Sequence, residues 1–204
     1  MNERILYMST RSPYARKILL ALKVKGLAFK AVGVDFANLP PEFVAVTPLR
    51  KIPVLVDEDG THIFDSTCIA QWLEERYPQP PLYPADLHER NTCRQMEELA
   101  DAVADQAVAL FQQTQRPDGG DRLSVEKMKA TLERLMIYLE QMAPPLGFFA
   151  GEEHWDLRDM ALVSSLGYLT FRHGDSWRER YPRLAAYETR ANEFPMFRET
   201  LPRV

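Results

Sequence analysis

A serine at the start of a predicted helix is the first candidate for chemistry. Ser12 precedes Pro13, and the stretch YMSTRSPYARKILLAL, residues 7–22, continues with apolar residues at helical spacing. Serine is a preferred N-cap and proline is favoured at the first helical position, so capping alone accounts for the pair. The same helix end carries a partial positive charge and unpaired N–H groups, which stabilise an anion such as a thiolate. The sequence therefore leaves two interpretations of Ser12 open, a helix cap and a group that binds a substrate's sulfur.

The chemistry available at this helix start is limited by the absence of cysteine. Residues 9–15 contain none, so the helix start cannot form a mixed disulfide with a substrate. A serine hydroxyl stays protonated and donates a hydrogen bond, which together with the helix end favours the ionised form of a nearby thiol. The pattern therefore favours activation of a substrate's thiol over thiol–disulfide exchange.

Two more segments of the first half carry residues that can bind a ligand. Pro53 follows Ile52 at the start of a predicted strand, where proline is tolerated and the preceding peptide bond is ordinarily trans. Lys51 beside them is either a solvated surface lysine or a partner for a ligand carboxylate. Asp65 and Ser66 are both preferred helix caps, but the helix that they open also provides a second anion site, with Asp65 as an acceptor for an ammonium group.

Up to about residue 80 the sequence alternates strand and helix signals. Apolar residues recur at helical spacing after Pro13 until Gly26 stops the helix. The strands before and after that helix should run parallel because the helix crosses between them, and a Glu-Asp-Gly turn should join the next two strands as an antiparallel hairpin. The predicted elements are strands within residues 4–8, 27–36 and 52–65, and helices over residues 13–25 and 66–77.

The proline-rich stretch YPQPPLYP, residues 77–84, cannot continue the last of these helices and separates two unlike halves. After it the sequence is helical almost throughout, with apolar stripes at residues 96–110 and 128–142 whose faces must meet each other. We therefore expect two domains, residues 1–80 and 87–204.

The stretch WDLRDMALVSSLGYLTF, residues 155–171, predicts the central helix of the second half. Asp156 and Asp159 stand in the N-cap and N3 positions, a carboxylate variant of the capping box. The helix is apolar nearly all round, which is typical of a helix surrounded by others. A further amphipathic helix is predicted over residues 181–194, and QRPDGGD, residues 115–121, predicts a mobile loop between the two earlier helices.

Several residues that can do chemistry are expected to be structural instead. Cys68 and Cys93 are expected to be free thiols, buried as small apolar side chains. Methionines at helical spacing are expected to fill the core: Met96, Met128, Met136 and Met142. Acidic residues on the first long helix are expected to form a solvated face: Glu97, Glu98, Asp101 and Asp105.

Composition and charge exclude several partners. The chain has 204 residues, 46% of them hydrophobic, which is enough for a sizeable core. Its 25 Lys and Arg residues are interspersed among 29 Asp and Glu residues, so no basic face for nucleic acid is expected. No run of about 18 apolar residues and no signal-peptide pattern occurs, which predicts a cytoplasmic protein without a membrane partner. The 4 histidines lack the spacing of metal ligands, so no metal site is expected.

An ordered set of motifs resembles one known family. SPYARK before an apolar helix, TPLRKIPVLVDEDG, FDSTCIAQWLEERYP and, in the helical half, DLRDMAL are similar to segments of the cytosolic glutathione S-transferases, above all to serine-type members and small bacterial proteins of that family. The resemblance covers essentially the whole chain. It implies an α+β thioredoxin-like N-terminal domain followed by an all-α helical-bundle C-terminal domain, with the active site in the cleft between them and a homodimer as the assembly.

The resemblance also implies roles for the candidate residues. Ser12, or alternatively Ser9, would activate the sulfur of glutathione, which is a co-substrate, and no metal or prosthetic group is implied. The peptide bond before Pro53 would be cis, leaving the backbone of Ile52 free to pair with the cysteinyl part of glutathione. The implied glutathione-binding residues are Lys51, Ile52, Pro53, Asp65 and Ser66.

The predicted function is transfer of glutathione to a small apolar electrophile, a detoxification reaction. The electrophile would lie against aromatic residues chosen by helix position: Tyr14, Phe111, Tyr168 and Phe171. Because the family's equivalent long helix lines the cleft and the dimer interface, Asp101 and Asp105 are also candidates for ligand contact. The alternatives are a binding or regulatory protein with the same fold and no turnover, and a glutathione-dependent reductase that would need a reactive Cys68.

Overall fold

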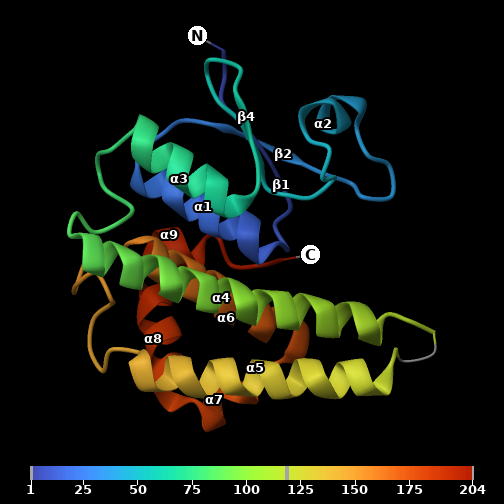
Figure 1. The fold of residues 1–204 in the computed structure, drawn as a ribbon, viewed down its shortest axis with the longest axis vertical. Coiled ribbons are helices and arrows are strands. Elements are labelled where there is room, and N and C mark those ends of the chain that lie inside the picture. Colours follow the sequence, from blue (N-terminus) through green and yellow to red (C-terminus); the bar gives the residue numbers. More distant parts are fainter. Residues whose placement is uncertain (1, 118–119, 204) are drawn as a thin grey trace.

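A computed structural model describes residues 2–117 and 120–203, and its first part contains a four-stranded mixed sheet in the order β2-β1-β3-β4 (Figure 1). The strands are β1 (Ile5–Met8), β2 (Lys30–Gly33), β3 (Val54–Val56) and β4 (His62–Ile63). β2 is parallel to β1, and β3 is antiparallel to both β1 and β4, which confirms the predicted crossover and hairpin. β2 is shorter than predicted because it lies at the edge of the sheet, where β1 offers only four residues for pairing.

The two faces of this sheet are covered by different helices. The side chains of Leu6 and Leu55 belong to the same apolar core as α1 (Pro13–Val24) and α3 (Ser66–Arg76). On the other face lies a smaller cluster of Tyr7, Val34, Phe43 and Val54, in which Phe43 comes from the short helix α2 (Pro41–Val46) (Figure 1). The sequence analysis did not predict α2, because it has only six residues and a single buried one, Phe43.

The second part is a helical bundle built around α6 (Leu157–His173). Residues 157–169 of α6 are all buried, and the helix packs against α4 (Leu87–Thr114) and α1, as its all-round apolar character predicts. The capping box of Asp156 and Asp159 is present. The remaining helices are α5 (Arg122–Met142), α7 (Trp177–Arg180), α8 (Pro182–Glu193) and α9 (Pro195–Arg198).

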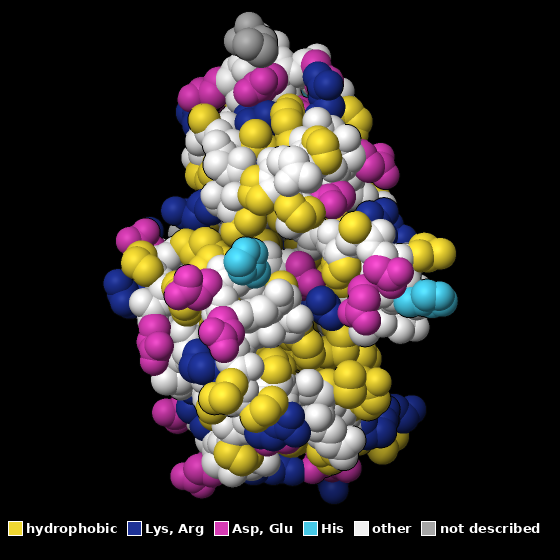
Figure 2. Space-filling model, turned by 90° about the vertical axis from the view of Figure 1, so that its left-hand side faces the viewer, with side chains coloured by type: hydrophobic (Ala, Val, Ile, Leu, Met, Phe, Trp, Pro, Cys, Tyr) yellow, Lys and Arg dark blue, Asp and Glu magenta, His cyan; other side chains and the backbone are white. Residues whose placement is uncertain are grey.

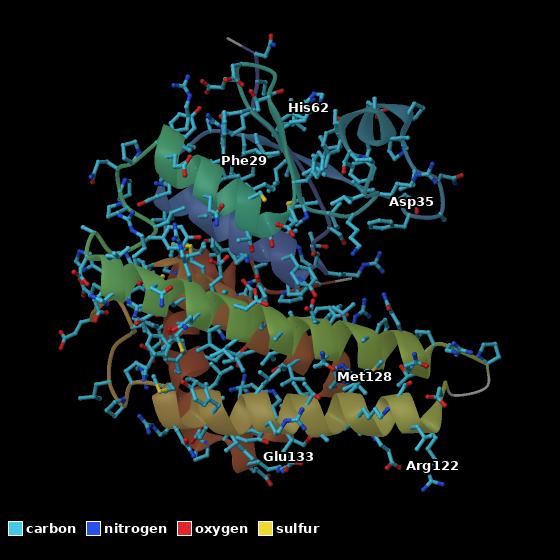
Figure 3. All side chains as sticks on the ribbon, viewed as in Figure 1. Phe29, Asp35, His62, Arg122, Met128 and Glu133 are labelled. Carbon is cyan, nitrogen blue, oxygen red and sulfur yellow. The ribbon has the colours of Figure 1, made fainter. Side chains whose placement is uncertain are left out.

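The predicted contact between the two apolar stripes is formed by α4 and α5, which lie side by side (Figure 1). Met128 points between the two helices, whereas Glu133 and Arg122 point away from α4 (Figure 3). Met96 and Met136 are buried as predicted, but Met142 is 42% exposed, because the buried side of this end of α5 runs through Met136, Leu139 and Ala143. Of the predicted loop at residues 115–121, residues 118–119 lie outside the described residues.

The prediction that both cysteines are buried is half right. Cys93 is buried in the main core, whereas Cys68 is exposed. Cys68 precedes the buried Ile69 in sequence, but successive residues of a helix point about 100° apart. The buried face of α3 runs through Ser66, Ile69 and Leu73, so the side chain of Cys68 turns towards the surface.

The segment between α3 and α4 is fixed to the end of α1. The Nζ atom of Lys25 donates hydrogen bonds to Pro80 O at 2.9 Å and to Glu74 Oε2 at 3.2 Å. Figure 2 shows the side of the molecule that carries this segment, where hydrophobic side chains lie among charged ones in both the upper and the lower parts. Within residues 2–117 and 120–203, no helix is both long and apolar enough to cross a lipid bilayer.

Candidate active site

A cavity of about 830 Å³ lies where α1 and α3 begin, facing α4 and α6. Both helices start on the side of the molecule where the C-terminus lies (Figure 1). The cavity brings together all of the residues that the sequence analysis proposed for glutathione: Ser9, Ser12, Lys51, Ile52, Pro53, Asp65 and Ser66. A second cavity of about 510 Å³, beside the linker, has none of the predicted site residues in its described lining.

Ser12 caps α1 and still has a proton to donate. Its Oγ accepts the N–H of Ala15 at 3.2 Å, and its own N–H donates to the carbonyl oxygen of Ser9 at 3.0 Å. A hydroxyl has one donor and two acceptor positions, so capping uses only an acceptor. Because no described residue accepts the hydroxyl proton of Ser12, capping and binding a ligand's sulfur are compatible rather than alternative roles.

Ser9 lies in the same cavity, one turn before the helix. Its Oγ accepts the N–H of Arg11 at 3.3 Å. The loop between the two serines is tied to the end of the chain, because the Oγ1 of Thr10 donates to Arg203 O at 3.1 Å. The geometry therefore places both hydroxyls at the helix start and assigns the N-cap position to Ser12.

The segment before β3 presents an unpaired backbone to the cavity. The Ile52–Pro53 peptide bond is cis, as the resemblance implied. Ile52 lies outside β3, and its backbone N–H and C=O form no hydrogen bond with a described residue. Lys51 is exposed at the cavity and forms no ion pair with the rest of the described chain.

Asp65 and Ser66 open α3 at the same cavity. The Oδ1 atom of Asp65 accepts the backbone N–H groups of Thr67 and Cys68, at 3.1 and 3.4 Å. This capping leaves the Oδ2 atom of Asp65 without a described hydrogen-bond partner. Ser66 is buried, and the Phe64–Asp65 peptide bond is also cis. A second helix N-terminus with a free carboxylate oxygen therefore faces the cavity.

The prediction of a solvated acidic face on α4 is half right, because Glu98 and Asp105 are exposed whereas Glu97 and Asp101 are not. Glu97 is only 2% exposed, because the buried ammonium of Lys17 on α1 donates to Glu97 Oε1 at 2.8 Å. The same ammonium bonds Asp101, and the hydroxyl of Tyr83 donates to Glu97 at 3.0 Å. Burial raises the pKa of Asp101 to about 6, although the charge of Lys17 acts in the opposite direction.

The four aromatic residues proposed for the electrophile separate into two pairs. Tyr14 and Tyr168 line the cavity, and the hydroxyl of Tyr14 donates to Asp105, which together with Asp101 also lines it. Phe111 and Phe171 are not among the described residues of the lining, so their prediction as pocket walls is not supported. Their rings instead stack on the guanidinium of Arg172, because all three side chains meet where α4 and α6 come together.

The cavity also contains residues that the sequence analysis missed. Arg11, Phe36, Leu49, Val108 and Arg172 all line it. Phe36 and Leu49 lie in loops beside α2, the helix that was not predicted, and no local pattern distinguishes Arg172 from any basic residue in the last turn of a helix. Throughout the described part of the chain, no cluster of three or more His, Cys, Asp or Glu side chains is arranged to hold a metal ion.

A thioredoxin-like domain followed by a helical domain, with two helices beginning at the cavity between them, defines a two-domain class of thioredoxin-fold proteins. Comparison with known sequences gives the family. A family model of the glutathione S-transferase N-terminal domain matches residues 6–81, and one of the C-terminal domain matches residues 70–190. The chain therefore belongs to the glutathione S-transferase family.

Similar proteins of known sequence or structure agree with this assignment. Glutathione S-transferase Z2 of Arabidopsis thaliana is 27% identical over 97% of this chain and 90% of its own length. A glutathione S-transferase of Methylobacillus flagellatus, solved with GSH bound, superimposes with a TM-score of 0.90 at 33% identity, covering 98% of this chain and 100% of its own. A glutathione S-transferase of Methylobacterium radiotolerans, in complex with glutathione sulfonate, superimposes with a TM-score of 0.88 at 31% identity, covering 100% of this chain and 96% of its own.

Proposed function

We propose that this chain is a glutathione transferase in which Ser12 donates a hydrogen bond to the sulfur of bound glutathione. The observation that carries the proposal is the hydroxyl of Ser12, which caps α1 through an acceptor position and keeps its proton for the cavity. The end of α1 adds a partial positive charge at the same place. A thiolate held there is stabilised by both, so more of the bound thiol is ionised near neutral pH.

The rest of glutathione is proposed to extend along the cavity. The free backbone groups of Ile52, beside Pro53, pair with its cysteinyl part, and Lys51 contacts its glycyl carboxylate. Ser66 and the start of α3 bind the α-carboxylate of the γ-glutamyl group, while the Oδ2 atom of Asp65 accepts from its ammonium. Relatives solved with GSH or glutathione sulfonate support glutathione as the ligand.

The proposed reaction is nucleophilic attack by the thiolate on an electrophilic carbon. A sulfur–carbon bond forms, and the electron pair of the broken bond departs with the leaving group or, in an addition, is protonated. The electrophile would lie between Tyr14 and Tyr168, which line the cavity. No metal or prosthetic group takes part in this reaction. We further propose that the domains comprise residues 1–80 and 87–204, that the assembly is a cytoplasmic homodimer, and that the role is detoxification, all on family resemblance.

The experiment that tests the proposal is the rate of glutathione conjugation with a general electrophile in Ser12→Ala. We expect kcat/KM to fall by about a hundredfold while the protein stays folded, because the substitution removes the donor to the thiolate. The matched control is Asp121→Ala, which removes the cap of α5 away from the cavity and should reduce stability without reducing the rate. An unchanged rate in Ser12→Ala would refute the proposal and favour a binding protein without turnover.

The reductase alternative has its own test. Cys68 is exposed near the start of α3, but it is not among the described residues that line the cavity. Under the proposed function, Cys68→Ser conjugates glutathione at the wild-type rate. Loss of a glutathione-dependent disulfide reduction in Cys68→Ser, with no conjugation in the wild type, would establish the alternative.

A further inference from the structure

Two arginines line the cavity beside Ser12 without a carboxylate partner. Arg11 immediately precedes Ser12, and Arg172 lies in the last turn of α6, across the cavity. Neither forms an ion pair with any residue in the described ranges. Tyr168 lines the same cavity, and burial raises the pKa of its hydroxyl, while the charge of Arg172, a hydrogen bond with Arg172 and the charge of Arg11 act in the opposite direction. Two positive charges without a carboxylate partner therefore line the same cavity.

Arg172 is placed between two aromatic rings. Its guanidinium carbon lies 4.0 Å from the ring centroid of Phe111 and 4.4 Å from that of Phe171. A planar cation between two rings is favourably placed and cannot turn freely towards solvent. Its Nε is buried and has no described hydrogen-bond partner. A buried donor without an acceptor is costly, and the contacts with the two rings help to offset that cost.

None of the acidic side chains in the cavity forms an ion pair with these arginines within the described part of the chain. Asp101 is engaged by the ammonium of Lys17, and Asp105 accepts the hydroxyl of Tyr14. Glu98 is exposed and forms no ion pair with the described part of the chain. Neither arginine is therefore committed to a carboxylate of the described chain, and both can accept a bound anion as partner.

We propose that the electrophile is itself an anion, whose carboxylate is bound by Arg172 and Arg11 while its reactive carbon faces the sulfur at Ser12. The guanidinium of Arg172 offers two parallel N–H donors, which match the two oxygens of a carboxylate. This inference rests on the proposed function, because it names the second substrate of the same cavity. It changes the class of electrophile from apolar, as the sequence analysis expected, to carboxylate-bearing.

The test is equilibrium binding of two glutathione conjugates that differ by one charge. S-(2-carboxyethyl)glutathione and S-propylglutathione have substituents of similar size, and only the first carries a carboxylate on the electrophile's side. By calorimetry we expect the wild-type protein to bind the carboxyethyl conjugate about tenfold more tightly, because charge-assisted hydrogen bonds to arginine are among the stronger polar contacts. We expect Arg172→Gln to lose this preference and to keep its affinity for S-propylglutathione within about twofold.

The control is Arg122→Gln, which removes an exposed arginine that points away from the bundle on α5 (Figure 3) and should change neither affinity. Arg11→Gln is the second variant if Arg172→Gln does not fold, because Arg11 is exposed, and it too should reduce the preference. Equal affinity of the wild type for both conjugates, or an equal loss of both in the variants, would overturn the inference.

Binding of glutathione itself separates this inference from the proposed function. If the protein binds glutathione but shows no preference between the conjugates, only the inference fails. If it does not bind glutathione, the proposed function fails and the inference with it.

Discussion

Gly167 on α6 faces the buried side chain of Arg16 on α1, and we predict that a single methyl group there destabilises the protein. A Cβ atom at Gly167 would lie 2.4 Å from the Nη1 of Arg16. That Nη1 donates to Val163 O at 2.8 Å, and the Nη2 donates to Phe197 O at 2.9 Å. Arg16 is 2% exposed, and burial lowers its pKa to about 10, so the guanidinium has no solvated position to move into.

We expect Gly167→Ala to lower the free energy of unfolding by about 2–5 kcal/mol. Displacing the guanidinium breaks two hydrogen bonds from a charged group, each worth about 1.5–3 kcal/mol. Alanine recovers only about 1 kcal/mol through its higher helix propensity. The loss therefore exceeds the gain, and the sign of the effect is opposite to that of an ordinary glycine-to-alanine change in a helix.

Urea unfolding followed by circular dichroism measures the effect. Gly33→Ala is the matched control, because a Cβ at Gly33 would meet no atom within 4 Å, and it should stay within about 1 kcal/mol of the wild type. In an Arg16→Met background the additional cost of Gly167→Ala should fall below about 1 kcal/mol, because the colliding group is gone. A cost below about 0.5 kcal/mol in the wild-type background would refute the reasoning.

Two further predictions concern the cavity and the sheet. Burial raises the pKa of Asp101 to about 6, so the stability that its carboxyl contributes is complete below about pH 4 and is lost as the pH rises through 6. Between pH 4 and 7, the free energy of unfolding of Asp101→Asn should therefore rise by up to about 3 kcal/mol relative to that of the wild type. Denaturant titrations measure this difference, and a difference that does not change with pH would contradict the prediction. Phe43 is fully buried with its ring 5.5 Å from that of Tyr7, so Phe43→Ala should cost about 3–5 kcal/mol. Val44→Ala on the exposed side of α2 is its control, and an equal cost in both variants would show that Phe43 does not anchor the helix.

The features that the sequence predicted well depend on local chemistry. Ser12 and Asp65 cap their helices, and Asp156 forms its capping box, because each bonds backbone groups within three residues of itself. The order of strands and helices follows from hydrophobic periodicity in the same way. The position of both caps at one cavity followed from the family resemblance rather than from the pattern alone.

Two kinds of feature were missed, those that depend on distant partners and one that depends on rotation about a helix. Glu97 is buried because the ammonium of Lys17, 80 residues earlier in the sequence, forms an ion pair with its carboxylate. The ring of Phe111 on α4 stacks on the guanidinium of Arg172 on α6, and nothing in the sequence around Phe111 indicates that contact. Phe171, which directly precedes Arg172, stacks on the same guanidinium. Cys68 was placed in the core by its neighbour Ile69, although rotation about the helix points it outward.

The most direct test of the central claim is the pKa of the glutathione thiol in its complex with the protein, measured by the ultraviolet absorbance of the thiolate as the pH is raised. A free thiol of this kind titrates near about 8.5. With wild-type protein we predict that the pKa falls by about one unit or more, and that in Ser12→Ala it returns most of the way to the free value. A bound thiol whose pKa is the same in both proteins would contradict the claim that Ser12 stabilises the thiolate.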